Sequence, residues 1–293
     1  MLLLTFCWVN TSSAQDTEPR RWAQIPTGVN FVGLAYGYTD GDIFFDPLLN
    51  IENATFELHS SAFAYIRTLG FMGKSARVDF SLPYKAGRWE GLLDGDFVSV
   101  RRRGPGDLRA RFSVLLYGGP AETPKEFVKS KKSNTVVGAA LAVTMPTGDY
   151  NSGRLINLGA NRWVIRPQLG VTHTRGKWTG EVTGSIFAYT DNNHFWQETK
   201  LETDPLFALQ AHLIYTFRPG LWASASTAYG WGGEATVNGD AKNNPSGNWL
   251  TALSFGFPIN RMQGIKVAWI RARTQKSTGA DNDSLLFAYS VMF

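Results

Sequence analysis

The chain has 293 residues, of which 43% are hydrophobic and 18% charged, with a net charge of +5 at pH 7. This balance excludes an intrinsically disordered protein and is typical of a folded chain of one large domain or two average ones. The mean hydropathy of −0.17 excludes several membrane helices, since each needs a run of roughly 20 apolar residues. Abundant Gly (30), Phe (19), Trp (10) and Tyr (10) favour closely paired strands with aromatic girdles.

The N-terminal stretch MLLLTFCWVNTSSAQ is predicted to be a signal peptide, because an apolar run precedes Ser12 and Ala14 at the two positions that signal peptidase reads. The basic residues that usually precede such a run are missing, so an upstream start is one interpretation and a frayed strand is another. Cys7, the single cysteine, lies in this stretch, which excludes disulfides and cysteine-based zinc sites from the rest of the chain. We assign 1–14 to the signal peptide and 15–28 to a periplasmic N-terminal segment.

Beyond this segment, apolar residues recur at every second position, the period of a β-strand. Near the middle of the chain, for example, Leu209 and Leu213 share an apolar face and Gln210 and His212 share the opposite one. About twelve strands are predicted, an even number as in closed bacterial barrels. The predicted segments are 29–38, 54–69, 75–84, 106–118, 134–145, 161–173, 177–190, 204–217, 219–231, 247–257, 263–273 and 284–293.

The connections between these segments alternate in length. Tight turns such as FMGK, TRGK and RPG alternate with connections of about a dozen residues or more that are rich in Gly, Asn and Asp. This asymmetry is typical of a membrane barrel with short periplasmic turns and long extracellular loops. GGPAETPKEFVKSKKSN is an exception, since it takes a periplasmic position but is long and basic. The predicted fold is an all-β, closed antiparallel transmembrane barrel over 29–293; a soluble β-sandwich is the alternative.

The final strand, LLFAYSVMF, presents a large apolar face made of Leu285, Phe287, Tyr289, Val291 and Phe293. Lipid accepts such a face on every strand, provided that a closed sheet satisfies the backbone hydrogen bonds. A terminal Phe after alternating apolar residues resembles the C-terminal signal of outer-membrane barrels. This resemblance implies that the barrel assembly machinery recognises Phe293, and that the protein lies in the bacterial outer membrane among its lipid and lipopolysaccharide.

Longer blocks of the sequence resemble one family of outer-membrane barrels. LLYGGPAETPKEF, MPTGDYNSGRLINLGANRWVIRPQLGV, FAYTDNNHFW and DPLFALQAHLIYTFRPGLWASASTAYGWGGEATVNG are similar to members of the MetA-pathway of phenol degradation family, also called transporters. The resemblance covers nearly all of residues 75–293. It implies a β-barrel in the outer membrane that moves aromatic or other hydrophobic compounds, and it assigns no functional residues.

The candidate functional residues are the polar and aromatic side chains predicted to face the lumen. If the large apolar residues face lipid, the inward set contains Glu57, His59, Arg67, Arg77, Asp79, Arg109, Arg111, Arg162, Arg166, Gln168, Glu181, Gln210, His212 and Lys266, with the aromatics Phe63, Tyr65, Phe187 and Tyr189. Cations outnumber anions, which favours passage of anions or polarised solutes; alternatively, the charges pair across strands and fill the bore. The predicted substrate-binding residues are Arg77, Asp79, Arg109, Arg111, Arg166, Glu181, Phe187, Tyr189 and His212.

Four further motifs carry less weight. His59 and Ser61 have a spacing also seen in outer-membrane phospholipase A, but both are predicted to face inward, away from lipid, and no orienting Asn or Asp follows, so no enzyme is predicted. TDNNHFW and GADNDS lack the acid spacing of a calcium loop, so no metal or cofactor is predicted. RRRGPGD, at 101–107, is predicted to meet lipopolysaccharide phosphates at the barrel rim, and no nucleic acid.

The sequence therefore predicts an outer-membrane channel or transporter that admits small hydrophobic or aromatic molecules by passive diffusion. An outer-membrane barrel that serves as a scaffold for an enzyme or an adhesin is the alternative. An adhesin needs large or sticky loops, and an enzyme needs an acid, a base and a nucleophile that converge.

Overall fold

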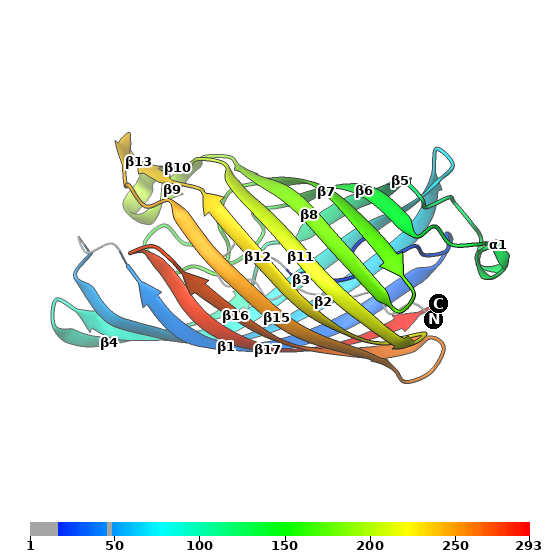
Figure 1. The fold of residues 1–293 in the computed structure, drawn as a ribbon. Helices are drawn as coiled ribbons and strands as arrows, with labels where there is room; N and C mark the ends of the chain where they lie inside the picture. Colours follow the sequence, from blue (N-terminus) through cyan, green and yellow to red (C-terminus); the bar gives the residue numbers. More distant parts are fainter. Residues whose placement is uncertain (1–16, 46–48) are drawn as a thin grey trace.

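The computed structural model describes residues 17–45 and 49–293; the signal peptide predicted over 1–14 lies outside this part of the chain. Within it, twelve strands pair antiparallel into one closed barrel (Figure 1). Each predicted segment overlaps one of these strands, so the predicted fold is confirmed. The wall consists of β1 (Asn30–Phe44), β2 (Ile51–Phe71), β3 (Lys74–Leu93), β5 (Arg109–Tyr117), β6 (Thr135–Thr144), β7 (Val164–Arg175), β8 (Trp178–Tyr189), β11 (Leu206–Arg218), β12 (Leu221–Gly232), β15 (Ser246–Pro258), β16 (Gln263–Thr274) and β17 (Gly279–Met292).

The barrel closes between its first and last strands. β1 pairs with β2 on one side and with β17 on the other. Just below this ladder, the backbones of Asn30 and Phe293 exchange two hydrogen bonds, of 2.9 and 3.0 Å. Each wall strand thus has a neighbour on both sides, so no strand edge is left open to lipid.

The end of the barrel with the long loops carries additional strands. The second half of β3 pairs with β4 (Asp96–Pro105), and its first half pairs with β5. Figure 1 shows the β3–β4 hairpin projecting beyond its neighbours. A separate small sheet at the same end contains β9 (Asn192–Phe195), β10 (Thr199–Thr203), β13 (Ala235–Val237) and β14 (Asp240–Ala241).

These additional strands were expected to be loops. The arginines of 101–103, predicted to lie at the barrel rim, belong to β4. The reason is hydrogen bonding. β3 extends beyond Ser81, its last residue paired with β5, and there β4 satisfies the backbone groups of β3 that would otherwise lack partners.

The long basic connection between β5 and β6 contains a short helix, α1 (Pro124–Lys129), with no buried residue. Thr123 and Glu126 form a capping box that starts the helix, in which the Glu126 carboxylate accepts the Thr123 backbone N–H at 2.8 Å. Lys132 donates to Glu122 at 2.9 Å, and this hydrogen bond, with a second from Ser130, lowers the pKa of Glu122. In the part of the chain described, no helix is long and apolar enough to cross a membrane.

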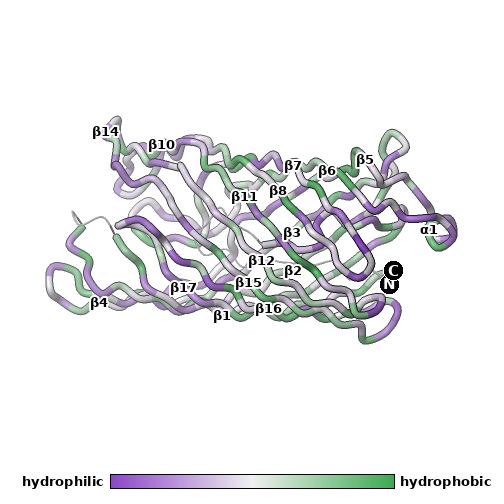
Figure 2. The backbone as a smooth tube through the Cα atoms, in the orientation of Figure 1, coloured by the Kyte–Doolittle hydropathy of each residue, from purple (hydrophilic) through white to green (hydrophobic). Residues whose placement is uncertain are grey.

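Alternate residues of each wall strand face lipid and lumen. On β11, Leu209 is 50% exposed and Gln210 is 3% exposed. On the last strand, Leu285 and Phe287 are 57% and 47% exposed, which confirms the predicted lipid-facing surface of that strand. In Figure 2, hydrophobic and hydrophilic positions alternate along the wall, whereas α1 is mostly hydrophilic. The outward faces of these two strands are therefore apolar.

On β2 the predicted assignment of the two faces is wrong. The odd-numbered side chains point outward; they include Glu57, His59, Ser61, Phe63, Tyr65 and Arg67. The even-numbered face is small and apolar, and it points inward because Ala62, Ala64 and Ile66 pack against a cluster that contains Ile25 and Phe31. The lumen is apolar at this position, so the polar face of β2 is the outer one.

The orientation of β11 predicts that Leu209→Arg is far more harmful than Gln210→Arg. An arginine at the lipid-facing midplane of a barrel costs about 2–4 kcal/mol, whereas lumenal changes alter selectivity. The free energy of unfolding, measured by denaturant titration in lipid vesicles, should fall by this amount for Leu209→Arg alone. Equal destabilisation by both variants would contradict the assignment of the two faces.

Candidate functional site

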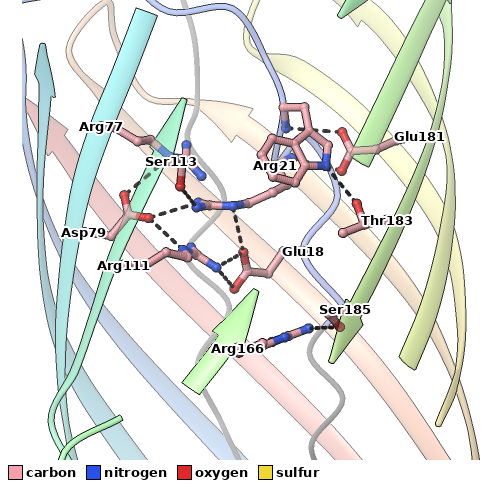
Figure 3. Close-up of polar contacts among 11 residues, drawn as sticks. Glu18, Arg21, Arg77, Asp79, Arg111, Ser113, Arg166, Glu181, Thr183 and Ser185 are labelled. Atoms are coloured by element: carbon pink, nitrogen blue, oxygen red, sulfur yellow. Dashed lines mark hydrogen bonds and ion pairs between the residues drawn. The ribbon is translucent and has the colours of Figure 1, made fainter. Parts of the chain in front are cut away.

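The chain before β1 lies inside the barrel. The sequence assigned 15–28 to a periplasmic segment, and the described part of it, 17–28, enters the barrel at the end that carries α1. Thr27 donates its backbone N–H to the Glu122 carbonyl at 2.8 Å. Deeper in the lumen, Glu18 and Trp22 are 4% and 0% exposed. Figure 3 shows this segment surrounded by side chains of the wall. We call residues 17–28 the inner segment.

Trp22 occupies a socket that glycines create. Gly138 on β6 and Gly170 on β7 are directly paired in the sheet. A Cβ on Gly138 would lie 2.1 Å from the Trp22 ring, and one on Gly170 would lie 2.0 Å from Trp22 Nε1. Trp22 Nε1 donates to Thr183 Oγ1 at 2.8 Å. Only glycine at both wall positions leaves room for the indole, so the wall is shaped to hold the inner segment.

An ionic cluster fixes the charged residues of the inner segment. Asp79 Oδ2 accepts from Arg21 Nη1 at 3.0 Å and from Arg111 Nε at 2.9 Å, and Arg77 Nε lies 3.4 Å from Asp79 Oδ1. Arg111 Nη1 also donates to Glu18 Oε2 at 2.7 Å. These side chains are at most 9% exposed, so the cluster is desolvated (Figure 3). Acids and bases of wall and inner segment thus compensate one another, as buried charges require.

Glu181 binds the backbone of the inner segment from the opposite wall. Its Oε1 accepts the Arg21 backbone N–H at 3.1 Å, and its Oε2 accepts the Trp22 N–H at 3.5 Å. His212 lies directly across from Glu181 in the sheet register and is 4% exposed. Contacts from both sides of the barrel therefore hold the inner segment.

A second group of lumenal residues lies nearer to the extracellular end. The Arg166 guanidinium lies 4.3 Å from the centre of the Phe187 ring and donates to Ser185 Oγ at 3.3 Å. The Arg162 guanidinium lies 4.3 Å from the centre of the Tyr189 ring. Such pairs offer an apolar face next to a cation. This part of the lumen therefore has cations and aromatic rings side by side.

The predicted substrate-binding residues all line the interior. Arg77, Asp79, Arg109, Arg111, Arg166, Glu181, Phe187 and His212 are buried, and Tyr189 is half-buried. Asp79, Arg111 and Glu181 contact the inner segment and Arg77 contacts Asp79, whereas Arg166, Phe187 and Tyr189 lie nearer the extracellular end. Their role in binding a substrate stays a prediction. Among the residues described, no cluster of His, Cys, Asp or Glu is arranged to hold a metal ion.

Sequence analysis missed Glu18, Arg21 and Trp22, because a short segment without a two-residue period resembles a linker. One signal was present in the sequence. Gly138 and Gly170 lie inside two neighbouring predicted strands, and glycine within a strand often marks a close approach of another part of the chain.

A closed β-barrel with an apolar outer surface and charged residues in its lumen defines a bacterial outer-membrane β-barrel. The family model described as Putative MetA-pathway of phenol degradation matches residues 39–287. The chain belongs to this family, as its sequence blocks predicted.

Solved structures agree with this assignment at the level of the fold. The COG4313 outer membrane channel from Pseudomonas putida F1 is 20% identical, with 94% of this chain and 100% of that chain covered and a TM-score of 0.80. The transport unit of the autotransporter AIDA-I from Escherichia coli is 7% identical, with 91% of each chain covered and a TM-score of 0.53. The β domain of the Bordetella autotransporter BrkA is 8% identical, with 90% and 99% covered and a TM-score of 0.52. No curated protein matches the chain.

Proposed function

We propose that this barrel is a passive channel for small aromatic or other hydrophobic molecules. The observation that supports it most strongly is an apolar cavity of about 190 Å³ at the extracellular end of the lumen. Trp89, Val98 and Val100 of the β3–β4 hairpin form one side of this cavity, and Leu155 and Ile156 of the loop before β7 close over it. Apolar walls of this kind favour hydrophobic solutes over sugars.

The route from this cavity passes the lumenal cation–aromatic pairs. Phe187 and Tyr189 offer aromatic surface to a solute, and the positive charges of Arg166 and Arg162 beside the two rings favour a carboxylate or a phenolic oxygen. At the other end, the inner segment and the ionic cluster narrow the lumen, and a cavity of about 320 Å³ lies beside Trp22 and Glu181. We infer that passage requires the inner segment to shift. The choice of aromatic solutes is also supported by the family to which the chain belongs, which is named after a phenol degradation pathway.

The proposal is tested by comparing Phe187→Ala with Phe207→Ala. Phe207 lies on the neighbouring strand and is 39% exposed on the lipid side, so it serves as the matched control. Loss of an aromatic contact of about 0.5–1.5 kcal/mol corresponds to a decrease of roughly 2- to 13-fold. Uptake of labelled benzoate by cells at limiting concentration should fall by this factor for Phe187→Ala only, and arabinose uptake should not change. Equal benzoate uptake by both variants, or faster entry of arabinose than benzoate, would contradict the proposal.

The terminal residue has a proposed role in assembly. Phe293 is 60% exposed at the end of the barrel where β1 and β17 meet, and its backbone is paired with Asn30. We expect deletion of Phe293, or its replacement by Asp, to impair insertion by the barrel assembly machinery. Heat-modifiable folded protein in outer-membrane fractions measures this effect. Normal amounts of the folded variant would exclude an assembly signal at this residue.

No observation favours the alternative of an enzyme or adhesin scaffold. His59 and Ser61 face outward, and the His59 Nδ1 is 2.7 Å from the Tyr36 hydroxyl. Among the residues described, no carboxylate is hydrogen-bonded to His59, so the pair lacks the third group that orients a catalytic base.

A further inference from the structure

A basic groove lies on the outer surface of the barrel, at the extracellular end of β2, β3 and β4. Arg101 and Arg103 of β4 point outward and are exposed. They lie across from Arg88 and Ala86 of β3 in the sheet register. Because residues 86 and 87 are small, the side chains around them enclose an open groove of about 520 Å³, which His59 also lines.

The groove lies immediately above the apolar band of the barrel. On β3, the outward side chains of Phe80, Leu82 and Tyr84 are 43%, 47% and 51% exposed. The stretch from Lys74 at the periplasmic turn to Tyr84 is about 33 Å long at roughly 3.3 Å per residue. At a strand tilt of about 40°, this length corresponds to the roughly 25 Å height of a barrel's apolar band. Arg88, Arg101 and Arg103 therefore lie at the level of the lipid headgroups of the outer leaflet.

The charges in this groove are incompletely balanced. Arg88 lies 3.4 Å from Glu57 and 3.2 Å from Glu90. Among the residues described, no carboxylate forms an ion pair with Arg101 or Arg103, and Arg101 lies directly opposite Arg88. Like charges directly opposite one another destabilise a sheet. A bound anion between these arginines would remove the repulsion.

Two arginines on β16 provide a contrast. Arg271 and Arg273 donate to the same carboxylate, that of Asp283, at 2.9 and 2.7 Å. Their charges are compensated within the protein. The excess of cations is thus a property of the β3–β4 groove and does not extend to every charged residue at the membrane surface.

We propose that this groove binds a phosphate group of lipid A in the outer leaflet. The guanidinium groups of Arg101 and Arg103 match the geometry of a phosphate and donate paired hydrogen bonds to it. The acyl chains of the same lipid lie along the outward face of β3, against Leu82 and Phe80, and the Tyr84 ring lies at the boundary. This lipid site is separate from the lumen, so it does not depend on which solute the channel admits.

The test uses the purified full-length barrel in detergent and the variant Arg101→Gln, Arg103→Gln. Titration with bis-phosphorylated lipid A, followed by native mass spectrometry, should show binding at least about tenfold weaker than in the wild type. Arg271→Gln is the matched control and should bind lipid A like the wild type. Heat modifiability verifies that each variant is folded.

Three further probes distinguish the source of the anion. Lipid A without phosphates should bind as weakly to the wild type as bis-phosphorylated lipid A binds to the double variant. Equal affinity for phosphatidylglycerol would mean a general anionic surface, and displacement of lipid A by millimolar inorganic phosphate would mean a simple anion site; either would overturn the proposal. Unchanged binding of lipid A to the folded double variant would overturn it as well.

Discussion

Replacing Trp22 with alanine is expected to open the barrel to ions. The indole is fully buried against Gly138 and Gly170, and its Nε1 is hydrogen-bonded to Thr183. Loss of a buried tryptophan costs about 3–5 kcal/mol, which corresponds to a change of roughly a hundredfold or more in the ratio of docked to undocked inner segment. Planar-bilayer recordings should therefore show higher and longer-lived conductance than in the wild type.

Trp178→Ala provides the control for this experiment. Trp178 is 52% exposed on the lipid side and contacts Tyr215, so its loss removes an aromatic ring without affecting the lumen. Its conductance should equal that of the wild type. If Trp22→Ala also conducts like the wild type while its fold is intact, the inner segment does not close the channel.

Replacing Asp79 with alanine is expected to destabilise the folded protein strongly. Its carboxylate lies within 3.4 Å of Arg21, Arg77 and Arg111, and its side chain is 5% exposed. Its removal leaves buried guanidinium groups without their shared anion. Breaking a buried ion pair in this way costs about 3–5 kcal/mol. Thermal denaturation followed by loss of heat modifiability should show the effect.

Asp283→Ala is the comparison for Asp79→Ala, because Asp283 also binds two arginines but lies on the outer surface, with its side chain 30% exposed. Exposed ion pairs contribute about 0–1 kcal/mol. The destabilisation should therefore be several times smaller than for Asp79→Ala. Equal effects of the two variants would mean that the lumenal cluster is hydrated and contributes little to stability.

The barrel itself was predictable from the sequence because lipid imposes a two-residue period on every strand. β8 shows why: Trp178, Val182 and Ile186 face lipid, and Glu181 and Ser185 face the lumen. The rule that polar residues point inward failed on β2. There the inward face packs against the apolar part of the inner segment, and the charged residues Glu57 and Arg67 point outward. A tertiary contact with another segment decided the orientation, and the pattern of the strand alone does not contain it.

The candidate site was predictable only in part, for a related reason. The buried charges on β3 and β5 were identified from alternation, but their partners Glu18 and Arg21 lie about sixty or more residues earlier in the chain. Alternation gives the face of a residue and does not give the segment that fills the lumen. The paired glycines that receive Trp22 were the one local indication. Similarly, β4 forms because the second half of β3 needs a pairing partner. This pairing across the hairpin cannot be identified from the residues of β4 alone.

We propose that the barrel is a channel for aromatic solutes and that the inner segment closes it. Benzoate entry into proteoliposomes is the most direct test of this proposal. The measurement is made at about pH 8, because benzoate is ionised there and crosses lipid slowly. Trp22→Ala barrels should admit benzoate at least about tenfold faster than wild-type barrels, as the loss of the Trp22 anchor implies, and adding Phe187→Ala should reduce that rate. A folded Trp22→Ala barrel that admits benzoate no faster than protein-free liposomes would contradict both the route and its closure.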